Sequence, residues 1–461
     1  MKLLLHALAT LWTLAITSVL GSVTTSLCGE QLVRHTGFVN GLYYVLFDSS
    51  STAPSQDIPL VLWLSGGPGC SGLVGALFEL GPCTFDDEAD KMLLNAYSWT
   101  NHAHVIFIDQ PHGTGFSSEY ENPRRWTERR AMDDLADFVD GFYQDHAALR
   151  DNDFFIFGES YGGHYAPDLA AVLVKRDAGW RSRIKGVGIG NGVVSPIANL
   201  QTYLDFAKGN KYATDLVGPM EPRMREKQQL ALKLSQECLD ATRRSYRLRA
   251  RARALENGDY PGVCRDAASA SAAFEMLALD GVRAAARNMY DVRRACHQSD
   301  RLGLCYYLSR LEDFVNQHAL EYFGVGDQKW SMCSATVMRE LPPVEFIEQS
   351  DSNVAFLLDN GVRVLVYAGD SDTMAHWNMQ DRWTHDLEWS GRDAFRQSPL
   401  RKLSLGGEGA AVGEVRSAHG LSLVRVYESG HMVPHDQPQV ALEMLRSFTT
   451  RPNQANGLLF S

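Results

Sequence analysis

Ser160 is the side chain best placed to act as a nucleophile. It lies in the sequence Gly-Glu-Ser-Tyr-Gly, residues 158–162, directly after the apolar run Phe154–Phe157 and before a helical pattern of apolar residues. Glycines on both sides of a serine let the backbone pack closely at a strand-to-helix turn, which exposes the hydroxyl at the carboxyl end of the strand. An ordinary turn could have the same five residues in a chain with 39 glycines, so the interpretation depends on finding partners for this serine.

A serine hydroxyl attacks efficiently only when a base removes its proton and a carboxylate orients that base. Two later apolar runs, 362–367 and 421–427, end in residues suited to these roles. Asp370 and Asp372 follow the first run, and His431 follows the second. Each candidate comes just past a buried strand, where open α/β sheets bind ligands, and the chain order is Ser, Asp, His. Either aspartate could orient the histidine, and the other would then cap a helix.

A sheet must hold these groups together. Continuous apolar runs predict buried strands at 60–64, 105–108, 154–157, 184–189, 362–367 and 421–427. Aromatic and β-branched residues around Asn40 and Gly41 predict a hairpin over 38–47. From about Leu200 to Leu341 the strand signals nearly vanish and helical spacing replaces them. The sequence therefore predicts an α/β fold with a mixed, mostly parallel sheet and an inserted helical cap.

We expect four segments along the chain. Residues 1–21 combine Lys2, an apolar run and small residues, which is typical of a secretory signal peptide; a membrane anchor is the alternative. Residues 22–192 and 336–461 would form the two parts of the core, and residues 193–335 the cap. No later run is long and apolar enough to span a membrane, so we expect no membrane contact after signal cleavage.

Composition narrows the range of partners and cofactors. A formal net charge of −11 argues against binding to nucleic acid. The eight cysteines fit the oxidising secretory pathway, with a secreted or a vacuolar or lysosomal destination. There is no C-x-x-C spacing, and His102 and His104 lack a third ligand, so we expect no metal. The glycines around Asn191 lack the dinucleotide-binding spacing, so we expect no cofactor.

Several motifs together resemble those of the serine carboxypeptidases. They are Trp-Leu-Ser-Gly-Gly-Pro-Gly-Cys at 63–70, Gly-Glu-Ser-Tyr-Gly-Gly-His-Tyr at 158–165, Tyr-Ala-Gly-Asp-Ser-Asp at 367–372 and Gly-His-Met-Val-Pro at 430–434. Asn-Met-Tyr-Asp at 288–291 and Trp-Ser-Met-Cys at 330–333 are also similar to that family. The resemblance implies an α/β-hydrolase fold and a serine-type carboxypeptidase that releases single residues from the C-termini of peptides and proteins.

The resemblance also implies roles for individual residues. It chooses Asp372 over Asp370, which gives the triad Ser160, Asp372 and His431. It implies that the backbone N–H groups of Gly67 and Tyr161 form the oxyanion hole, which stabilises the tetrahedral intermediate. The substrate-binding residues that it implies are Ser65, Gly66, Glu79, Glu159 and Met432. Where the family usually has an asparagine that helps two glutamates hold the substrate's carboxylate, this chain has Ser65, a shorter hydrogen-bond donor.

Disulfide pairing is a further expectation from the resemblance, which implies a bridge between Cys70 and Cys333. Two pairs within the cap are plausible neighbours, namely Cys296 with Cys305 and Cys238 with Cys264. Elimination leaves Cys28 with Cys83. We also predict that the six arginines among residues 243–253 form either a solvated helix face or an exposed site of proteolytic cleavage.

Glu79 and Glu159 lead to a prediction about pH. Two carboxyl groups held close together cannot both ionise cheaply, so the pKa of one is raised. A protonated glutamate can donate a hydrogen bond to the carboxylate of a peptide, whereas an ionised one repels it. We therefore expect peptide cleavage to be favoured in mildly acid solution.

Two alternatives to a carboxypeptidase remain at this point. An acyltransferase of the same fold would pass the acyl group from Ser160 to an alcohol, and a catalytically inactive chain would act as a binding or protective protein. Plant acyltransferases of this fold commonly have aspartate before the serine, so Glu159 favours the peptidase. The residue preference and the oligomeric state, with a homodimer as one hypothesis, stay open.

Overall fold

The structure is a computed structural model that describes residues 27–29, 34–86, 90–120, 126–213, 215–246, 259–296, 308–405 and 409–450. The predicted signal peptide, residues 1–21, lies outside these ranges, as do Cys305 and most of the arginine-rich segment. A search of the helices in the described ranges finds none with the length and apolar character that a membrane span needs.

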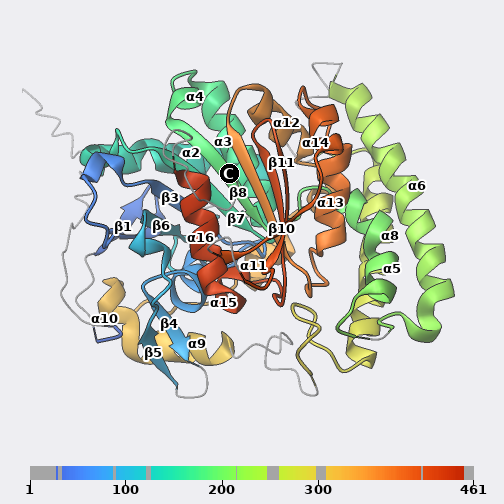
Figure 1. The fold of residues 1–461 in the computed structure, drawn as a ribbon, viewed down its shortest axis with the longest axis horizontal. Helices are drawn as coiled ribbons and strands as arrows, with labels where there is room; N and C mark the ends of the chain where they lie inside the picture. Colours follow the sequence, from blue (N-terminus) through green and yellow to red (C-terminus); the bar gives the residue numbers. More distant parts are fainter. Residues whose placement is uncertain are drawn as a thin grey trace, which may run out of the picture.

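A ten-stranded mixed sheet runs through the molecule (Figure 1), in the order β1-β2-β6-β3-β7-β8-β9-β12-β11-β10. Its strands are β1 (Arg34–Val39), β2 (Leu42–Phe47), β3 (Leu60–Leu64), β6 (His104–Ile108), β7 (Phe154–Glu159), β8 (Ile184–Gly190), β9 (Arg363–Gly369), β10 (Arg401–Leu403), β11 (Gly413–Ala418) and β12 (Leu421–Val426). The six strands from β6 to β12 pair in parallel, and antiparallel strands complete both edges. The predicted mixed, mostly parallel sheet is confirmed.

The first hairpin follows the local sequence. Asn40 and Gly41 connect β1 to β2 with φ angles of 51° and 81°. Two successive residues with positive φ form the tight turn whose twist matches that of the strands it joins. A separate two-stranded sheet, β4 (Cys83–Asp86) with β5 (Lys91–Leu94), lies outside the main one.

Helices cover both faces of the main sheet. One apolar core contains side chains of α2 (Glu128–Asp145), α3 (Gly162–Arg176), α12 (Asp351–Asp359), α13 (Trp377–Asp386) and α14 (Arg392–Gln397). The core on the other face includes α1 (Gly72–Val74), the π-helix η2 (Gly75–Glu79) and α16 (Pro438–Thr449). Shorter helices are α4 (Trp180–Arg183), α11 (Ala335–Glu340) and α15 (Val433–Asp436), with 3-10 turns η1 (Ser55–Asp57), η3 (Trp99–Asn101), η5 (Ala147–Leu149), η6 (Gly218–Met220) and η8 (Glu345–Ile347).

The helices of the predicted cap, 193–335, lie in two places. The helices α5 (Pro196–Gly209), α6 (Glu221–Tyr246) and α8 (Gly262–Ala284) share an apolar cluster of their own and stand at one side of the sheet (Figure 1). In contrast, α9 (Leu308–Phe314), η7 (Val315–Ala319) and α10 (Leu320–Phe323) bury apolar side chains in a different core, the one that also contains side chains of α16. The cap segment therefore does not pack as one unit.

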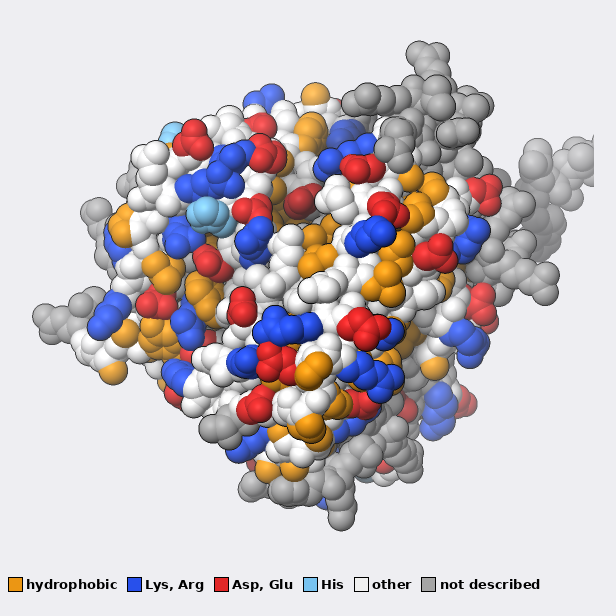
Figure 2. Space-filling model, turned by 90° about the vertical axis from the view of Figure 1, so that its right-hand side faces the viewer, with side chains coloured by type: hydrophobic (Ala, Val, Ile, Leu, Met, Phe, Trp, Pro, Cys, Tyr) orange, Lys and Arg blue, Asp and Glu red, His pale blue; other side chains and the backbone are white. Residues whose placement is uncertain are grey.

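The face of the molecule beyond α6 and α8 has a mixed charge. Figure 2 shows basic and acidic side chains interspersed there, with small apolar areas between them. A nucleic-acid-binding surface would instead gather lysine and arginine into a stripe or patch. This face offers no such stripe among its described residues, in keeping with the net charge of −11.

Candidate active site

Ser160 lies at a sharp turn between β7 and α3. Its φ of 61° is unusual for a residue with a side chain, and its N–H donates to the carbonyl of Gly190 at 3.1 Å. A Cβ on Gly158 would come within 2.1 Å of the carbonyl oxygen of Gly162, and one on Gly66 within 2.6 Å of the Tyr161 nitrogen. Glycine is therefore needed at both positions because backbone lies against backbone.

His431 and Asp372 are in contact, although 59 residues separate them. The Nδ1 atom of His431 lies 2.6 Å from Oδ2 of Asp372, and both side chains are buried. Asp372 also accepts hydrogen bonds from the Asn191 amide at 2.8 Å and from the N–H groups of Met374 and Ala375 at 2.8 and 3.1 Å. The other ring nitrogen of His431, Nε2, has no hydrogen-bond partner in the described part of the chain.

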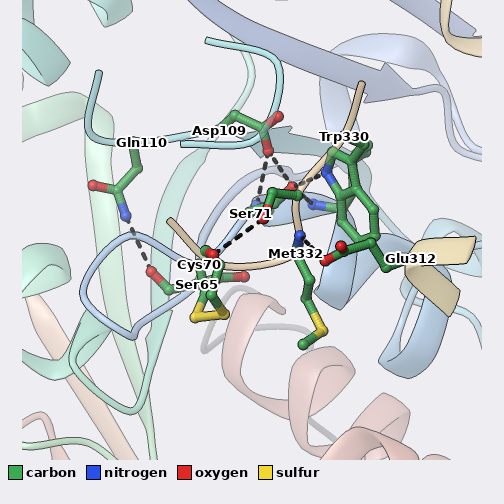
Figure 3. The surroundings of a disulfide bond; sticks show 12 residues. Ser65, Cys70, Ser71, Asp109, Gln110, Glu312, Trp330 and Met332 are labelled. Atoms are coloured by element: carbon green, nitrogen blue, oxygen red, sulfur yellow. Dashed lines mark hydrogen bonds between the residues drawn. A yellow bond between two sulfur atoms is a disulfide. The ribbon is translucent and has the colours of Figure 1, made fainter. Parts of the chain in front are cut away.

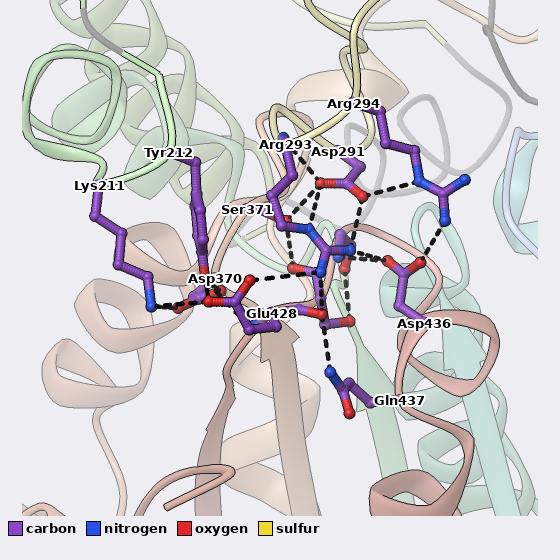
Figure 4. A network of polar contacts seen from close by, with 12 residues as sticks. Lys211, Tyr212, Asp291, Arg293, Arg294, Asp370, Ser371, Glu428, Asp436 and Gln437 are labelled. Atoms are coloured by element: carbon purple, nitrogen blue, oxygen red, sulfur yellow. Dashed lines mark hydrogen bonds and ion pairs between the residues drawn. The ribbon is translucent and has the colours of Figure 1, made fainter.

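Asp370, the other aspartate of the pair, has a different environment. It accepts a hydrogen bond from the Tyr212 hydroxyl at 2.7 Å and pairs with Lys211 at 3.4 Å (Figure 4). It also pairs with Arg425 at 3.7 Å. The expectation that this aspartate caps a helix is wrong, because His376 caps the next helix, α13. Asp370 instead connects the loop after β9 to the segment after α5.

Four of the predicted site residues line one cavity of about 210 Å³, namely Gly67, Ser160, Tyr161 and His431. Asp372 lies behind His431 and does not line this cavity. The tertiary structure thus brings three segments to the same space: the turn at Ser160 between β7 and α3, the glycine loop after β3 and the loop after β12. An acyl group bound there would meet the serine hydroxyl, the imidazole and the backbone of both loops.

The glycine loop after β3 is held on its far side by a disulfide (Figure 3). Cys70 is bonded to Cys333, as the resemblance implied. Backbone hydrogen bonds flank the bridge on both sides, from Ser71 N–H to Met332 at 2.8 Å and from Ser334 N–H to Gly69 at 2.8 Å. The bridge therefore connects the end of the cap segment to the loop that contains Gly67, which has a φ of 110°.

The other described cysteines are also paired. Disulfides join Cys28 to Cys83 and Cys238 to Cys264, the latter between α6 and α8. Cys296 is disulfide-bonded, and its predicted partner, Cys305, lies outside the described residues. All three disulfides between described cysteines are pairs that the sequence analysis named.

Glu79 and Glu159 lie side by side, buried to 3% and 6% exposure. Glu79 ends η2 and Glu159 ends β7, and their carboxyl groups share a hydrogen bond. Burial raises the pKa of Glu79 to about 7, although the bond from Glu159 opposes the rise. Burial, and then the charge of Glu79, raises the pKa of Glu159 well above its ordinary value. The two carboxyl groups thus lie as close together as the sequence analysis expected.

Ser65 and Met432 are two further residues that the resemblance assigned to substrate binding. The Ser65 hydroxyl accepts a hydrogen bond from the Trp63 indole at 3.1 Å, and the Ser65 carbonyl accepts one from Gln110 at 3.0 Å. The hydroxyl hydrogen of Ser65 has no acceptor among the described residues, so it can be donated to a ligand. Met432 follows His431 and is 8% exposed.

An ion-pair network fixes the loop that contains His431 (Figure 4). Asp436 pairs with Arg293 and Arg294, each at 3.1 Å, and accepts a hydrogen bond from the Gly430 N–H at 2.6 Å. Asp291 accepts a hydrogen bond from Ser371 at 2.8 Å and pairs with Arg293 at 2.7 Å. The residues around Asn288–Asp291 therefore hold together the loops after β9 and β12, a role that the sequence did not reveal.

A second set of buried acids lies behind Tyr161. The Tyr161 hydroxyl donates to Glu128 at 2.8 Å, and its ring stacks on His164 with 4.7 Å between centroids. His164 pairs with Glu128 at 3.3 Å, and neighbouring acids include Asp168 and Glu345. Burial first, and then the charge of Glu128, raises the pKa values of Asp168, Glu345 and Glu348 to about 7, 9 and 7.

Three residues of this second set have the donor atoms of a cation site. One ligand atom each from Glu128, His164 and Asp168 lie within 4.8 Å of one another. Their internal contacts explain the arrangement without an ion, since His164 pairs with Glu128 while Ser350 and Asn353 donate to Asp168 at 3.1 and 2.7 Å. This set was not predicted: His164 and Asp168 are four residues apart on α3, but Glu128 comes from α2 and meets them only in the fold.

Asn191 is the neighbour of the proposed triad that sequence reasoning missed. It donates to Asp372 through its side chain and also accepts a hydrogen bond from the Gly369 N–H at 3.1 Å. Its position directly after β8, between two glycines, was the available signal, since it places the amide at the same sheet edge as Ser160.

Comparison with known proteins agrees with this geometry. The sequence profile of the family described as Serine carboxypeptidase matches residues 34–451. Serine carboxypeptidase 3 of Oryza sativa subsp. japonica is 33% identical over 422 residues, which cover 88% of this chain and 76% of that protein. A vacuolar serine-type carboxypeptidase of Saccharomyces cerevisiae is 31% identical over 416 residues, covering 88% of this chain and 76% of that one.

A solved structure shows the same fold. The crystal structure of a prohormone-processing carboxypeptidase from Saccharomyces cerevisiae superimposes with a TM-score of 0.71 at 22% identity, covering 91% of this chain and 87% of that one. The sheet and its helices are thus those of an α/β hydrolase. Within that class, the chain belongs to the serine carboxypeptidase family and is a serine-type carboxypeptidase.

Proposed function

We propose that this carboxypeptidase acts through an acyl-enzyme on Ser160, with His431 as the base and Asp372 as the carboxylate that orients it. The observation that carries the proposal is the 2.6 Å contact between His431 Nδ1 and Asp372 Oδ2, next to a serine held at a φ of 61°. A carboxylate at Nδ1 keeps the proton on that nitrogen, so Nε2 is left to accept the proton of the serine hydroxyl.

The reaction would proceed in two steps. Ser160 Oγ attacks the carbonyl carbon of the last peptide bond while His431 takes its proton, and the N–H groups of Gly67 and Tyr161 donate to the oxyanion. His431 then returns the proton to the leaving amine, and the C-terminal residue departs as a free amino acid. A water molecule, activated by the same imidazole, hydrolyses the ester and restores the serine.

Recognition of the free C-terminus would be the task of Glu79, Glu159 and Ser65, with Gly66 and Met432 beside them. Since Glu159 donates to Glu79, a fully protonated pair has the O–H of Glu79 left to donate to the substrate's carboxylate. When pH rises through the pKa of Glu79, about 7, the pair becomes negatively charged and repels that carboxylate. Acid solution should therefore favour cleavage of peptides with free C-termini.

The secretory pathway is the proposed location, with a secreted or a vacuolar or lysosomal destination. The disulfides among the described residues support it, because such bonds persist in oxidising compartments. The name of the related vacuolar enzyme from Saccharomyces cerevisiae is in keeping with one of these destinations.

Labelling with an organophosphate tests the catalytic proposal. We expect one adduct per chain, located by peptide mapping on Ser160, together with the loss of peptide cleavage. The Ser160→Ala variant should neither be labelled nor cleave, with a loss of about a thousandfold or more in kcat. Ser195→Ala is the matched control and should retain both properties. An adduct on another residue, or a fully active Ser160→Ala variant, would refute the proposal.

A further inference from the structure

The cavity at Ser160 extends over one face of helix α8. Glu275, Ala278 and Leu279, which are three and four positions apart on this helix, all line it. Most of the remaining lining beyond the reacting groups is apolar or aromatic and includes Tyr203, Phe274, Phe346, Met374 and Met379. Glu275 is the only acidic side chain that lines this cavity within the described ranges.

Glu275 has no counter-ion in the part of the chain that the structure describes. Neither an ion pair nor a hydrogen bond to its carboxylate occurs among the described residues, and burial is the sole cause that raises its pKa to about 7. Its side chain is nevertheless exposed, because it faces the open cavity, so a ligand in the cavity can reach the carboxylate. An accessible carboxylate beside apolar walls, with no positive charge next to it, is suited to a ligand that brings a positive charge.

The position of the cavity tells which part of a substrate would enter it, and this step rests on the proposed function. Ser160 and Tyr161 line the cavity, whereas Glu79 and Glu159 do not. If the C-terminal carboxylate binds at the two glutamates, the leaving residue occupies their side of Ser160. The residue on the acyl side of the scissile bond, the penultimate residue of the peptide, then extends into the cavity.

We infer that Glu275 makes this enzyme prefer peptides with a basic penultimate residue, lysine or arginine. The apolar walls formed by Tyr203, Phe274 and Leu279 suit the aliphatic stem of such a side chain, and the carboxylate of Glu275 suits its charged end. A neutral aliphatic side chain fills the same walls but leaves the carboxylate unpaired. Specificity would thus come from charge rather than from size.

Two peptides that differ only in charge at the penultimate position test the inference. One carries lysine and the other norleucine, each followed by the same C-terminal phenylalanine. At pH 7.5 we expect kcat/KM of the wild-type enzyme to be about tenfold higher for the lysine peptide, as one charged hydrogen bond would give. The Glu275→Gln variant should bring the ratio close to one while it cleaves the norleucine peptide normally. Glu275→Lys should reverse the preference toward a glutamate peptide.

Asp266→Asn is the matched control, because Asp266 is an exposed acid on the same helix and does not line the cavity. This variant should keep the tenfold ratio. A wild-type ratio of one, or an equal loss on both peptides in Glu275→Gln, would overturn the inference. If Glu275→Gln changed kcat/KM only for peptides with a basic C-terminal residue, the assignment of Glu275 to the acyl side would be overturned. Failure of the wild-type enzyme to cleave either peptide would instead contradict the proposed function.

The ratio between the two peptides should also depend on pH. Below about pH 7 the free Glu275 carboxyl is protonated, so we expect the preference for lysine to be smaller at pH 5 than at pH 7.5. The lining also contains His431, Tyr161, Tyr203 and Tyr290. The Glu275→Gln variant keeps all four, so its ratio should not change with pH in the same way. A ratio that stays constant over this range in the wild-type enzyme would count against an ionised Glu275 as its cause.

Discussion

Two groups of buried acids lie near Ser160, and they differ in how their oxygens are satisfied. In the first group, Glu79 and Glu159 share a hydrogen bond with each other. The Oε2 atom of each has no hydrogen-bond partner among the described residues. The second group lies behind Tyr161 and receives hydrogen bonds from the protein. Tyr161 donates to Glu128, the Glu128 N–H donates to Glu345 at 2.7 Å, and Ser350 and Asn353 donate to Asp168.

The comparison teaches that a raised pKa does not by itself identify a functional acid. Burial raises pKa values in both groups, to about 7 for Glu79 and for Asp168. Only the first group adjoins the nucleophile in the sequence, through Glu159. In the second group, Oε1 of Glu128 has no hydrogen bond among the described residues but pairs with His164 at 3.3 Å. We therefore assign Glu79 and Glu159 to substrate binding, and the second group to support of Tyr161 from behind.

Removing a carboxyl group from the first pair should have the largest effect. We expect Glu159→Ala to lower kcat/KM on a peptide by about 10- to 100-fold at pH 5.5, because a hydrogen bond to a charged group is lost. Cleavage of the matching peptide amide, which has no terminal charge, should change by less than about threefold. Steady-state kinetics on both substrates measures this. Equal losses on the two substrates would show that Glu159 serves the fold rather than the carboxylate.

The pH dependence of the two substrates should diverge by a smaller factor. As pH rises from 5 to 8 through the pKa of Glu79, about 7, the pair gains a negative charge, so kcat/KM for the peptide should fall about tenfold relative to the amide. Glu159→Gln leaves only one titratable carboxyl, which should shift and weaken this divergence. Parallel pH profiles in the wild-type enzyme would contradict the proposed role of the pair.

A substitution in the second group should change stability instead of catalysis, and its effect should be the smallest of the three. Glu345 has a pKa of about 9 in the fold against about 4.3 when unfolded, so between these values only the folded state holds the proton. Stability should then fall as pH rises from about 4.3 toward 9. Glu345→Gln should remove part of this loss. Its free energy of unfolding should exceed that of the wild-type enzyme by about 1 kcal/mol at pH 8 and by little at pH 4.5, as measured by denaturant unfolding.

Activity provides the control for that variant. Glu345→Gln should keep kcat/KM on peptide and on amide within about twofold of the wild-type enzyme, because Glu345 does not line the cavity at Ser160. A selective loss on the peptide substrate would place the second group in substrate binding and would remove the distinction between the two groups of acids.

Much of the fold was predictable because its signals are local. Continuous apolar runs predict the central strands, and β7, β8 and β12 begin and end within one or two residues of the predicted bounds. The turn at Asn40 and Gly41 and the elbow at Ser160 also follow from short sequences. The packing of 308–323 apart from the other cap helices was not predictable, because helical spacing does not show which surface a helix covers.

The sequence by itself determined which residues follow the strands, because strand formation depends on neighbouring side chains; this placed Ser160, both aspartates and His431 at one sheet edge. The strand pattern left both aspartates possible and the resemblance chose Asp372; the tertiary structure shows that Asp372 contacts His431 while Asp370 contacts Lys211 and Tyr212. It alone brought Glu79 to Glu159 across 80 residues and Glu275 into the cavity. The physical reason is that these contacts join segments that meet only when the chain has folded, so no local pattern determines them.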